Sequence, residues 1–226
     1  MTALSPPAAA RPPADTAAAL VLAGAGILSF AVVLHHPTLQ GVHDAQGAVR
    51  AIHALGNLDR AVHGSLMALI ALQTAAYWRF TARLGADKPL ALMGFVAYAL
   101  ATATMMIPAT LDGFVTPDLS DACLPASSCG AGREAMFALV SACIQDFTKL
   151  ALAATSFAIL FWAIAGTRTR LGVPILLIGL ACAVPPLAVL WLSGLRLQPH
   201  NLALFLLGQV VWGLVAAWRL WRNEMR

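Results

Sequence analysis

The sequence contains few charged residues, and this scarcity excludes a soluble protein. Only 11% of its 226 residues are Asp, Glu, Lys or Arg, whereas 60% are hydrophobic and the mean hydropathy is +0.78. Soluble domains carry about 25% charged residues. Several stretches run for ~18 residues or more with few or no charges, long enough to cross the ~30 Å hydrocarbon core of a bilayer. The composition predicts an all-α membrane protein, because a spanning segment must satisfy its own backbone hydrogen bonds.

The sequence also lacks the local motifs that mark many functional sites. It contains no HExxH, no paired HxxxH and no CxxC motif, so no metal or redox site is evident from neighbouring residues alone. Its first fifteen residues, MTALSPPAAARPPAD, include four prolines and one arginine. A secretory signal would place a basic segment directly before an apolar core. We therefore expect residues 1–15 to form a disordered tail rather than a cleaved signal peptide.

Apolar segments predict a six-transmembrane-helix bundle over residues 16–226. The expected spans are residues 16–36, 60–82, 88–112, 134–165, 171–193 and 199–221. Between the first two spans, polar and apolar residues alternate at helical spacing. This pattern predicts a periplasmic amphipathic helix over 44–57 that lies on the membrane surface or caps the bundle. Gly56 and Asn57 are expected to separate it from the second span.

Basic residues gather on one side of this topology and so predict its orientation. Nine lie on the side of the N-terminus: Arg11, Arg79, Arg83, Lys88, Arg168, Arg170, Arg219, Arg222 and Arg226. Four lie on the other side: Arg50, Arg60, Arg133 and Arg196. Because cytoplasmic loops carry the excess of Lys and Arg, both termini are expected in the cytoplasm of a bacterial inner membrane. The net charge of +4 then reflects topology and not a nucleic-acid partner.

Two of the four cysteines fall in one predicted periplasmic loop. Cys123 and Cys129 lie in the stretch TPDLSDACLPASSCGAGRE. The oxidising periplasm permits a disulfide between them, and two unpaired thiols are the alternative. Cys143 and Cys182 fall inside predicted spans and are expected to be small core residues.

All six histidines are expected on the periplasmic side: His35, His36, His43, His53, His63 and His200. Imidazole and carboxylate ligands together favour zinc, iron or copper. Four candidate ligands come from four different spans at a similar depth, namely His36, His63, Asp112 and His200. These residues predict a metal site, in one version that of a small membrane enzyme with a metal-activated water. The alternative is that they are interfacial groups in contact with lipid headgroups and water.

Three further residues are secondary candidates for this site. Asp59 precedes His63 by one helical turn and is placed to orient its imidazole. Glu134 opens the fourth span on the same side, and His35 competes with His36 for the position that faces the bundle. His36 lies on the same face of the first predicted helix as Ser29, so His36 is the one favoured to face the bundle.

Polar residues recur at helical spacing along four of the expected spans. The stripes are Gly26, Ser29, Val33 and His36; Asp59, His63, Met67, Ile70, Thr74 and Tyr77; Tyr98, Thr102, Met105, Ala109 and Asp112; and Glu134, Ser141, Gln145 and Lys149. Polar stripes of membrane bundles point inward. The pattern predicts a polar core that opens toward the periplasm.

Two other functions are compatible with the sequence. Asp146 and Lys149 lie three residues apart in the fourth span, next to Gln145. An unpartnered charge is unfavourable at that depth, so we expect an ion pair that is either structural or the relay of a transporter or of a subunit of a larger membrane complex. A pair drawn from His36, His63 and His200 could instead bind haem b for electron transfer. The sequence leaves a homo-oligomer open as well.

Short motifs at the predicted helix ends resemble those of a known group. HHP closes the first span, HG at 63–64 opens the second, LDGF at 111–114 closes the third and PHN at 199–201 opens the sixth. This arrangement resembles a group of uncharacterised bacterial multi-pass membrane proteins over most of the chain. The resemblance implies a six-helix membrane protein and no particular activity. The resemblance does not extend to the histidine loop or the Cys123/Cys129 loop.

Overall fold

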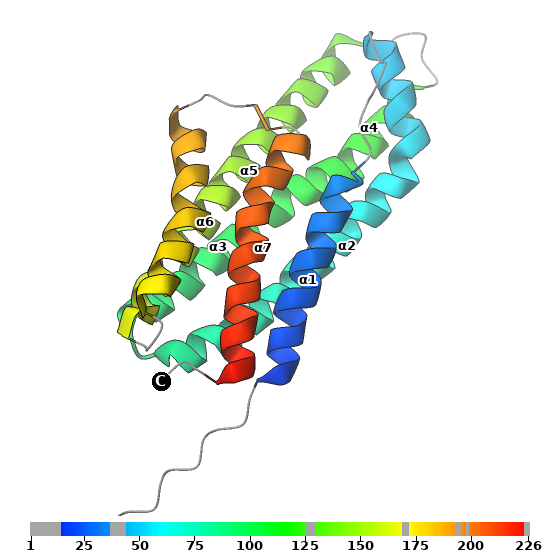
Figure 1. Cartoon of the computed structure of the whole chain (residues 1–226). Coiled ribbons are helices and arrows are strands. Elements are labelled where there is room, and N and C mark those ends of the chain that lie inside the picture. The colour runs from blue at the N-terminus through cyan, green and yellow to red at the C-terminus, as the bar shows by residue number, and fades with distance from the viewer. Residues whose placement is uncertain are drawn as a thin grey trace, which may run out of the picture.

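The chain folds into helices packed side by side (Figure 1). The computed structural model describes residues 15–36, 44–124, 130–168, 172–192, 196–197 and 199–223, and no strand occurs within these ranges. The elements are α1 (Thr16–Leu34), α2 (Ala45–Gly85), α3 (Pro89–Thr110), the π-helical turn η1 (Leu111–Val115), α4 (Thr116–Cys123), α5 (Ala131–Ala165), the 3-10 turn η2 (Gly166–Arg168), α6 (Gly172–Leu192) and α7 (Pro199–Arg222). The all-α fold predicted from composition is confirmed. The predicted tail lies outside the described residues, apart from Asp15.

Five helical segments in the described part of the chain are long and apolar enough to cross a membrane: Thr16–Leu34, Pro89–Cys123, Gly132–Ala165, Gly172–Leu192 and Asn201–Arg222. α2 contains the second predicted span but is not among the five. Its apolar residues are interrupted by polar ones such as His63 and Gln73, which lowers its hydropathy. The structure therefore supports a membrane protein, and the sixth span stays a prediction.

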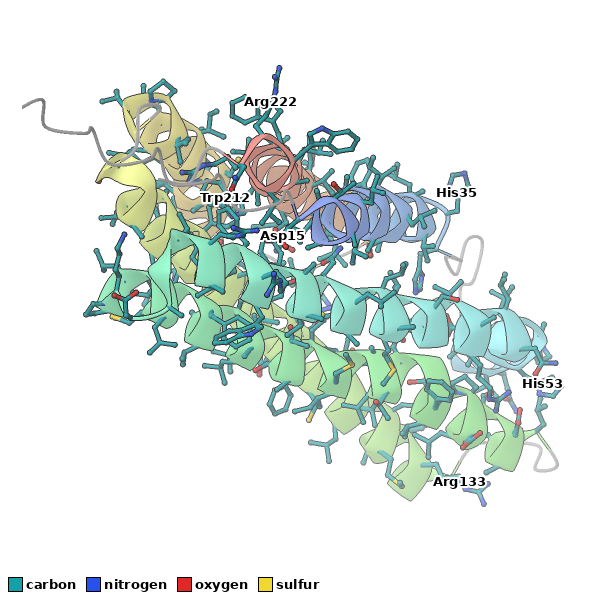
Figure 2. The ribbon with its side chains drawn as sticks, turned by 90° about the horizontal axis from the view of Figure 1, so that it is seen from below. Asp15, His35, His53, Arg133, Trp212 and Arg222 are labelled. Carbon is teal, nitrogen blue, oxygen red and sulfur yellow. The ribbon has the colours of Figure 1, made fainter. Side chains whose placement is uncertain are left out.

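The long helices form a ring. α1 packs against α2, α2 against α3, α3 against α5, α5 against α6, α6 against α7, and α7 returns to α1. Seen from below, α6, α7 and α1 lie in one row, with α2 and the two green helices α3 and α5 on the other side (Figure 2). Both ends of the chain's helical part, the start of α1 and the end of α7, lie at the same end of the bundle (Figure 1).

α2 is one continuous helix of 41 residues, so the predicted break at Gly56 and Asn57 is wrong. At ~1.5 Å per residue such a helix is about 61 Å long. A bilayer with its headgroups is only ~40–45 Å thick, so α2 is longer than a bilayer is thick. Gly56 is buried, and a Cβ placed on it would lie 3.3 Å from the Cβ of Pro117. The small residue lets α4 pack closely against the unbroken helix.

The stretch after the third predicted span is helical as well, where a loop was expected. α3 continues through η1 into α4, which packs beside the first part of α2. Ion pairs join the two helices: Arg60 Nη2 lies 2.6 Å from Asp118 Oδ1, and His53 Nδ1 lies 2.6 Å from Asp121 Oδ1. Residues 44–57, predicted to lie on the membrane surface or to cap the bundle, are therefore largely part of the same long helix as the second predicted span.

The predicted disulfide is not tested by the described residues. Cys123 is fully buried at the end of α4, and Cys129 lies outside the described part of the chain. Cys143 is a half-buried thiol and Cys182 a buried one. The bridge between Cys123 and Cys129 stays a prediction.

Aromatic side chains fill the end of the ring near the chain termini. Tyr77 stacks on Trp162 with 4.7 Å between ring centroids and 14° between planes, and Tyr98 lies 4.4 Å from Tyr77. The Trp162 indole donates a hydrogen bond to Thr81 Oγ1 at 3.0 Å. Phe80 packs edge-on against Trp162 at 5.8 Å. Because these rings are buried, they close the interior of the bundle at this end.

An ion cluster ties the start of α1 to the end of α2. Asp15 Oδ1 lies 2.8 Å from Arg79 Nη2, and Asp15 Oδ2 lies 2.6 Å from Arg83 Nε. Burial alone would raise the pKa of the Asp15 carboxyl, but the hydrogen bonds and charges of Arg83 and Arg79 together hold that pKa below its ordinary value. The charged form of Asp15 is therefore favoured in the folded protein.

We expect Asp15→Asn to lower the free energy of unfolding at neutral pH by roughly 0.5–1 kcal/mol, the range of partly exposed ion pairs. A carboxyl whose pKa falls on folding stabilises the protein above its unfolded pKa of ~3.9, and that stabilisation disappears as the pH falls through the folded pKa. Thermal unfolding of the detergent-solubilised protein across a pH series should show the two curves converging in acid. Asp87→Asn, at an exposed position, is the control. A difference between Asp15→Asn and wild type that does not change with pH would contradict this account.

Candidate metal centre

α1 ends in two histidines that face different surroundings. His35 is the C-terminal cap of α1, and its exposed ring folds back so that Nδ1 lies 2.8 Å from the Ala31 carbonyl oxygen (Figure 2). His36 instead lines the interior cavity of the bundle. Consecutive helical side chains point about 100° apart, so only one of the two reaches the interior. The prediction that His36 faces the bundle is confirmed.

α2 supplies a histidine and its orienting partner from successive turns. His63 Nδ1 lies 3.0 Å from the Asp59 carbonyl oxygen and 3.4 Å from Asp59 Oδ1. A neutral imidazole that donates from Nδ1 to this carbonyl has its lone pair on Nε2. Asp59 therefore directs Nε2 of His63 toward Asp112 in η1, in the manner of the outer partners that orient metal-binding histidines.

A local irregularity in the third span presents Asp112. Pro108 lies inside α3, and the helix then widens into the π-helical turn η1, which begins at Leu111. Both the backbone N–H and the hydroxyl of Thr116 donate to the Leu111 carbonyl five residues earlier, the latter at 2.9 Å. π-helical turns are rare and occur frequently at functional sites. Here the turn carries Asp112 and Gly113, which both face α2.

Gly113 lets the two helices meet without a side chain between them. A Cβ placed on Gly113 would lie 2.3 Å from the Cβ and 2.6 Å from the Cγ of His63. Real Cβ atoms do not approach so closely, so only glycine fits the present geometry. The HG and LDGF motifs, 48 residues apart in the sequence, are thus in direct contact.

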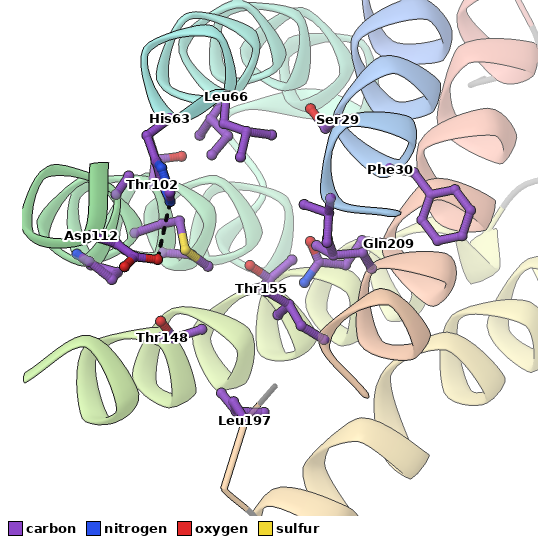
Figure 3. A pocket seen from close by; sticks show the side chains of 18 of the residues that line it. Ser29, Phe30, His63, Leu66, Thr102, Asp112, Thr148, Thr155, Leu197 and Gln209 are labelled. Carbon is purple, nitrogen blue, oxygen red and sulfur yellow. Dashed lines mark ion pairs between the residues drawn. The ribbon is translucent and has the colours of Figure 1, made fainter. Parts of the chain in front are cut away.

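The side chains of His36, His63 and Asp112 converge at this contact. Asp112 Oδ2 lies 3.4 Å from His63 Nε2 and 3.9 Å from His36 Nε2, and one ligand atom from each residue lies within 4.8 Å of the other two. Figure 3 marks the His63–Asp112 pair. The imidazoles meet edge to face with 5.1 Å between their centroids. The structure therefore brings together three of the four predicted ligands.

The two acidic side chains of this cluster favour a compensating positive charge. Asp59 Oδ1 is buried, accepts no hydrogen bond from the described residues, and lies 3.7 Å from His36 Nε2. With both imidazoles neutral, Asp59 and Asp112 place two negative charges in a largely enclosed site, which is unfavourable without a partner. A divalent cation, or protons on both imidazoles, would balance them. The arrangement is chemically suited to either.

The remaining candidates are distributed as follows. His200 lies in the first turn of α7, but its side chain is outside the described residues, as is all of His43. Glu134 is exposed on the first turn of α5. His53 pairs with Asp121 on the outer part of α2. Neither Glu134 nor His53 is placed at the cluster, and His200 stays an untested fourth ligand.

The predicted pair in the fourth span is not formed. Asp146 is exposed, Lys149 is half-buried, and no ion pair joins these two described residues. Gln145 instead binds the connection between α6 and α7: its Nε2 donates to the Leu197 carbonyl at 2.9 Å, and the Leu197 N–H donates to its Oε1 at 2.7 Å. Gln145 thus fixes this connection against α5, and Lys149 lines a separate groove with Arg196.

The contact between the His36 and His63 rings also bears on haem. A bis-histidine haem needs its macrocycle between the two imidazoles. Edge contact at a centroid distance of 5.1 Å leaves no space for it. The predicted haem pairs that include His200 stay untested, because its side chain lies outside the described residues.

The cluster lies in the wall of a cavity of about 540 Å³ (Figure 3). All members of the first and third predicted stripes line it, so their inward orientation is confirmed: Gly26, Ser29, Val33, His36, Tyr98, Thr102, Met105, Ala109 and Asp112. Only part of the second and fourth stripes does so. Sequence analysis did not predict the contributions of Thr148, Thr155 and Gln209 to the wall. The seven-residue spacing of the two threonines was the available signal, since it places both on one face of α5.

No family model, curated protein or solved structure matches the chain. The function is therefore inferred from the geometry of the chain itself. The resemblance of its helix-end motifs to bacterial multi-pass membrane proteins brings no activity with it.

Proposed function

We propose that the chain is a membrane protein that binds one transition-metal ion through His36, His63 and Asp112. The observation that carries this proposal is the convergence of two imidazoles and a carboxylate from three separate helical segments within 4.8 Å. Metal–ligand bonds are ~2.0–2.2 Å long, so small side-chain rotations bring the three atoms to a common centre. Two histidines and a carboxylate suit zinc or non-haem iron, and imidazole also suits copper.

We further propose that the protein is a small metal-dependent membrane enzyme. Catalytic metal sites have three protein ligands and an open position, whereas structural zinc sites are closed by four. The three ligands here line a cavity large enough for a substrate. A metal in such a site lowers the pKa of its bound water toward ~7 and so supports hydrolysis. Asp59 would hold the His63 ring in the tautomer that binds the ion.

We place this site on the periplasmic side of a bacterial inner membrane, with α1, α2, α3, α5, α6 and α7 as six spans and both termini in the cytoplasm. The cluster and the predicted Cys123–Cys129 bridge would share the periplasmic end. Arg79 and Arg83 lie at the opposite end of the bundle, where α1 begins and α7 ends. Basic residues are in excess on the cytoplasmic side of membrane proteins, so this end would be cytoplasmic. Reporter fusions test the orientation: activity of an exported reporter placed after Arg226 would contradict it.

Metal-dependent stabilisation tests the binding proposal. Protein stripped with a chelator and titrated with Zn²⁺, Fe²⁺ or Cu²⁺ should melt at a higher temperature. A ligand at 100 times its Kd stabilises the folded state by ~2.7 kcal/mol. The metal-induced rise in melting temperature should become smaller as the pH falls, since protons compete with the metal for imidazole. An unchanged melting temperature with all three metals would leave the protonated cluster as the explanation of the charge balance.

A further inference from the structure

The cavity behind the metal site is long and narrow. Along the continuous helix α2 it extends from Ile52 to Tyr77, and His63 lies between them. His63 and Tyr77 are fourteen positions apart, which corresponds to about 21 Å along the helix axis. A volume of about 540 Å³ spread over more than that length describes a channel and not a rounded pocket. The shape of this channel fits an extended hydrocarbon chain.

Three polar side chains of the channel wall already have hydrogen-bond partners within the protein. Thr148 and Thr155 donate to the carbonyl groups of Ile144 and Ala151 in their own helix, at 2.6 and 2.9 Å. Tyr98 donates to Gln73 Oε1 at 3.0 Å. These three side chains therefore present mainly carbon to the interior, and an apolar occupant would leave none of the three unsatisfied.

Two parts of the channel differ in chemistry. Tyr77 and Trp162 stack to form an aromatic floor at the end near the chain termini. His36, His63 and Asp112 lie farther along the channel, in the direction of Ile52. Between these two parts Ser29 lines the channel below His36, and its hydroxyl oxygen is buried with no hydrogen-bond partner among the described residues (Figure 3). Buried polar atoms are rarely unpartnered, so this hydroxyl is available to the polar part of an occupant.

We propose that the channel binds a long-chain acyl compound from the membrane, with its hydrocarbon chain on the Tyr77–Trp162 floor and its carbonyl end beside Ser29 and the His36–His63–Asp112 cluster. The position of the carbonyl end rests on the proposed metal site. The position of the chain rests only on the shape and the apolar wall of the channel. Substrates of the proposed enzyme are accordingly acyl esters or amides of the bilayer.

Two glycines on α1 provide a matched pair of variants. Gly26 lines the channel, and the nearest atom to a Cβ placed there is Gln73 Nε2 at 3.8 Å, so Gly26→Leu adds a side chain to the channel without a clash at Cβ. A Cβ on Gly24 meets nothing within 4 Å. Gly24→Leu therefore adds the same side chain to the same helix outside the channel.

The position of the hydrocarbon chain can be tested by native mass spectrometry. The detergent-solubilised holo protein is mixed with a homologous series of saturated fatty alcohols, and the affinity for each is measured. Affinity should rise about four-fold per added methylene and stop rising once the channel is full. Gly26→Leu should bind the longer alcohols at least about ten-fold more weakly, and Gly24→Leu as wild type does. Equal binding by Gly26→Leu and wild type, or affinity independent of chain length, would overturn the proposal.

Metal content measured in the same samples separates this inference from the proposed function. Both leucine variants should keep the wild-type metal content, because neither glycine is a ligand. Chain-length-dependent alcohol binding by a protein without metal would refute the metal site and support the channel assignment. Metal binding with no alcohol binding would support the metal site and refute the channel assignment.

Discussion

Alanine in place of His63 is expected to abolish stoichiometric metal binding. His63 is the central member of the cluster: its Nε2 lies 3.4 Å from Asp112 Oδ2, and its ring contacts that of His36. Its removal leaves one imidazole and one carboxylate, which cannot hold a transition metal against competing water and buffer. Loss of a partner that merely orients a ligand costs ~10–100-fold in metal affinity, and loss of the ligand itself should cost more. Elemental analysis after loading and desalting measures the effect.

Two variants serve as comparisons for His63→Ala. Asp59→Asn should weaken binding by ~10–100-fold without abolishing it, because Asp59 orients His63. His53→Ala also removes an imidazole paired with a carboxylate, Asp121, but at an exposed position outside the cluster. It should keep full metal content. Full metal content in His63→Ala, or a loss in His53→Ala, would show that the ion is bound elsewhere.

Gly113→Ala is expected to destabilise the fold and disturb the site together. The new methyl group would lie 2.3 Å from the Cβ of His63, so η1 and α2 must move apart. Overpacking of this kind costs about 1–3 kcal/mol. The same movement separates Asp112 from His63, so the metal should bind more weakly. Thermal unfolding with and without metal measures both effects.

Gly24→Ala is the matched control for this substitution. Both glycines are helical, but a Cβ at Gly24 meets no atom within 4 Å. Alanine there should leave stability unchanged or raise it slightly, since alanine is the better helix former. A melting temperature for Gly113→Ala equal to that of Gly24→Ala would mean that the close contact between η1 and His63 does not exist in solution.

Sequence analysis predicted the helical class and the inward-facing stripes because both depend on local regularities. Apolar length identifies spans, and helical spacing identifies which side of a span is polar. The stripe from Gly26 to His36 lines the cavity as expected. The proximity of His36, His63 and Asp112 was also predicted, because they were assigned to one side of the expected spans. His63 nevertheless lies in the middle of α2 and not at a helix end.

The features that the sequence did not predict arise from contacts between distant segments. Gly56 was expected to break a helix, but Pro117 packs against it and the helix continues. Asp118 and Asp121 were expected in a loop, yet they pair with Arg60 and His53 on α2 and so stabilise α4. The π-helical turn that presents Asp112 carries no simple sequence signal.

The expected pair of Asp146 and Lys149 failed for a related reason. The sequence places both residues on one helix but does not say which neighbours surround them. Gln145 finds its partner in the backbone of Leu197, 52 residues away, and Asp146 is exposed. A spacing of three residues permits an ion pair and does not require one.

The metal-to-protein ratio tests the central claim most directly. Wild-type protein and the triple variant His36→Ala, His63→Ala, Asp112→Asn should be purified without chelators, loaded with Zn²⁺, Fe²⁺ or Cu²⁺, desalted and analysed for metal. The account predicts about one tightly bound ion per wild-type chain and none in the triple variant. Equal metal content in the two proteins, or no retained metal in the wild type, would contradict it.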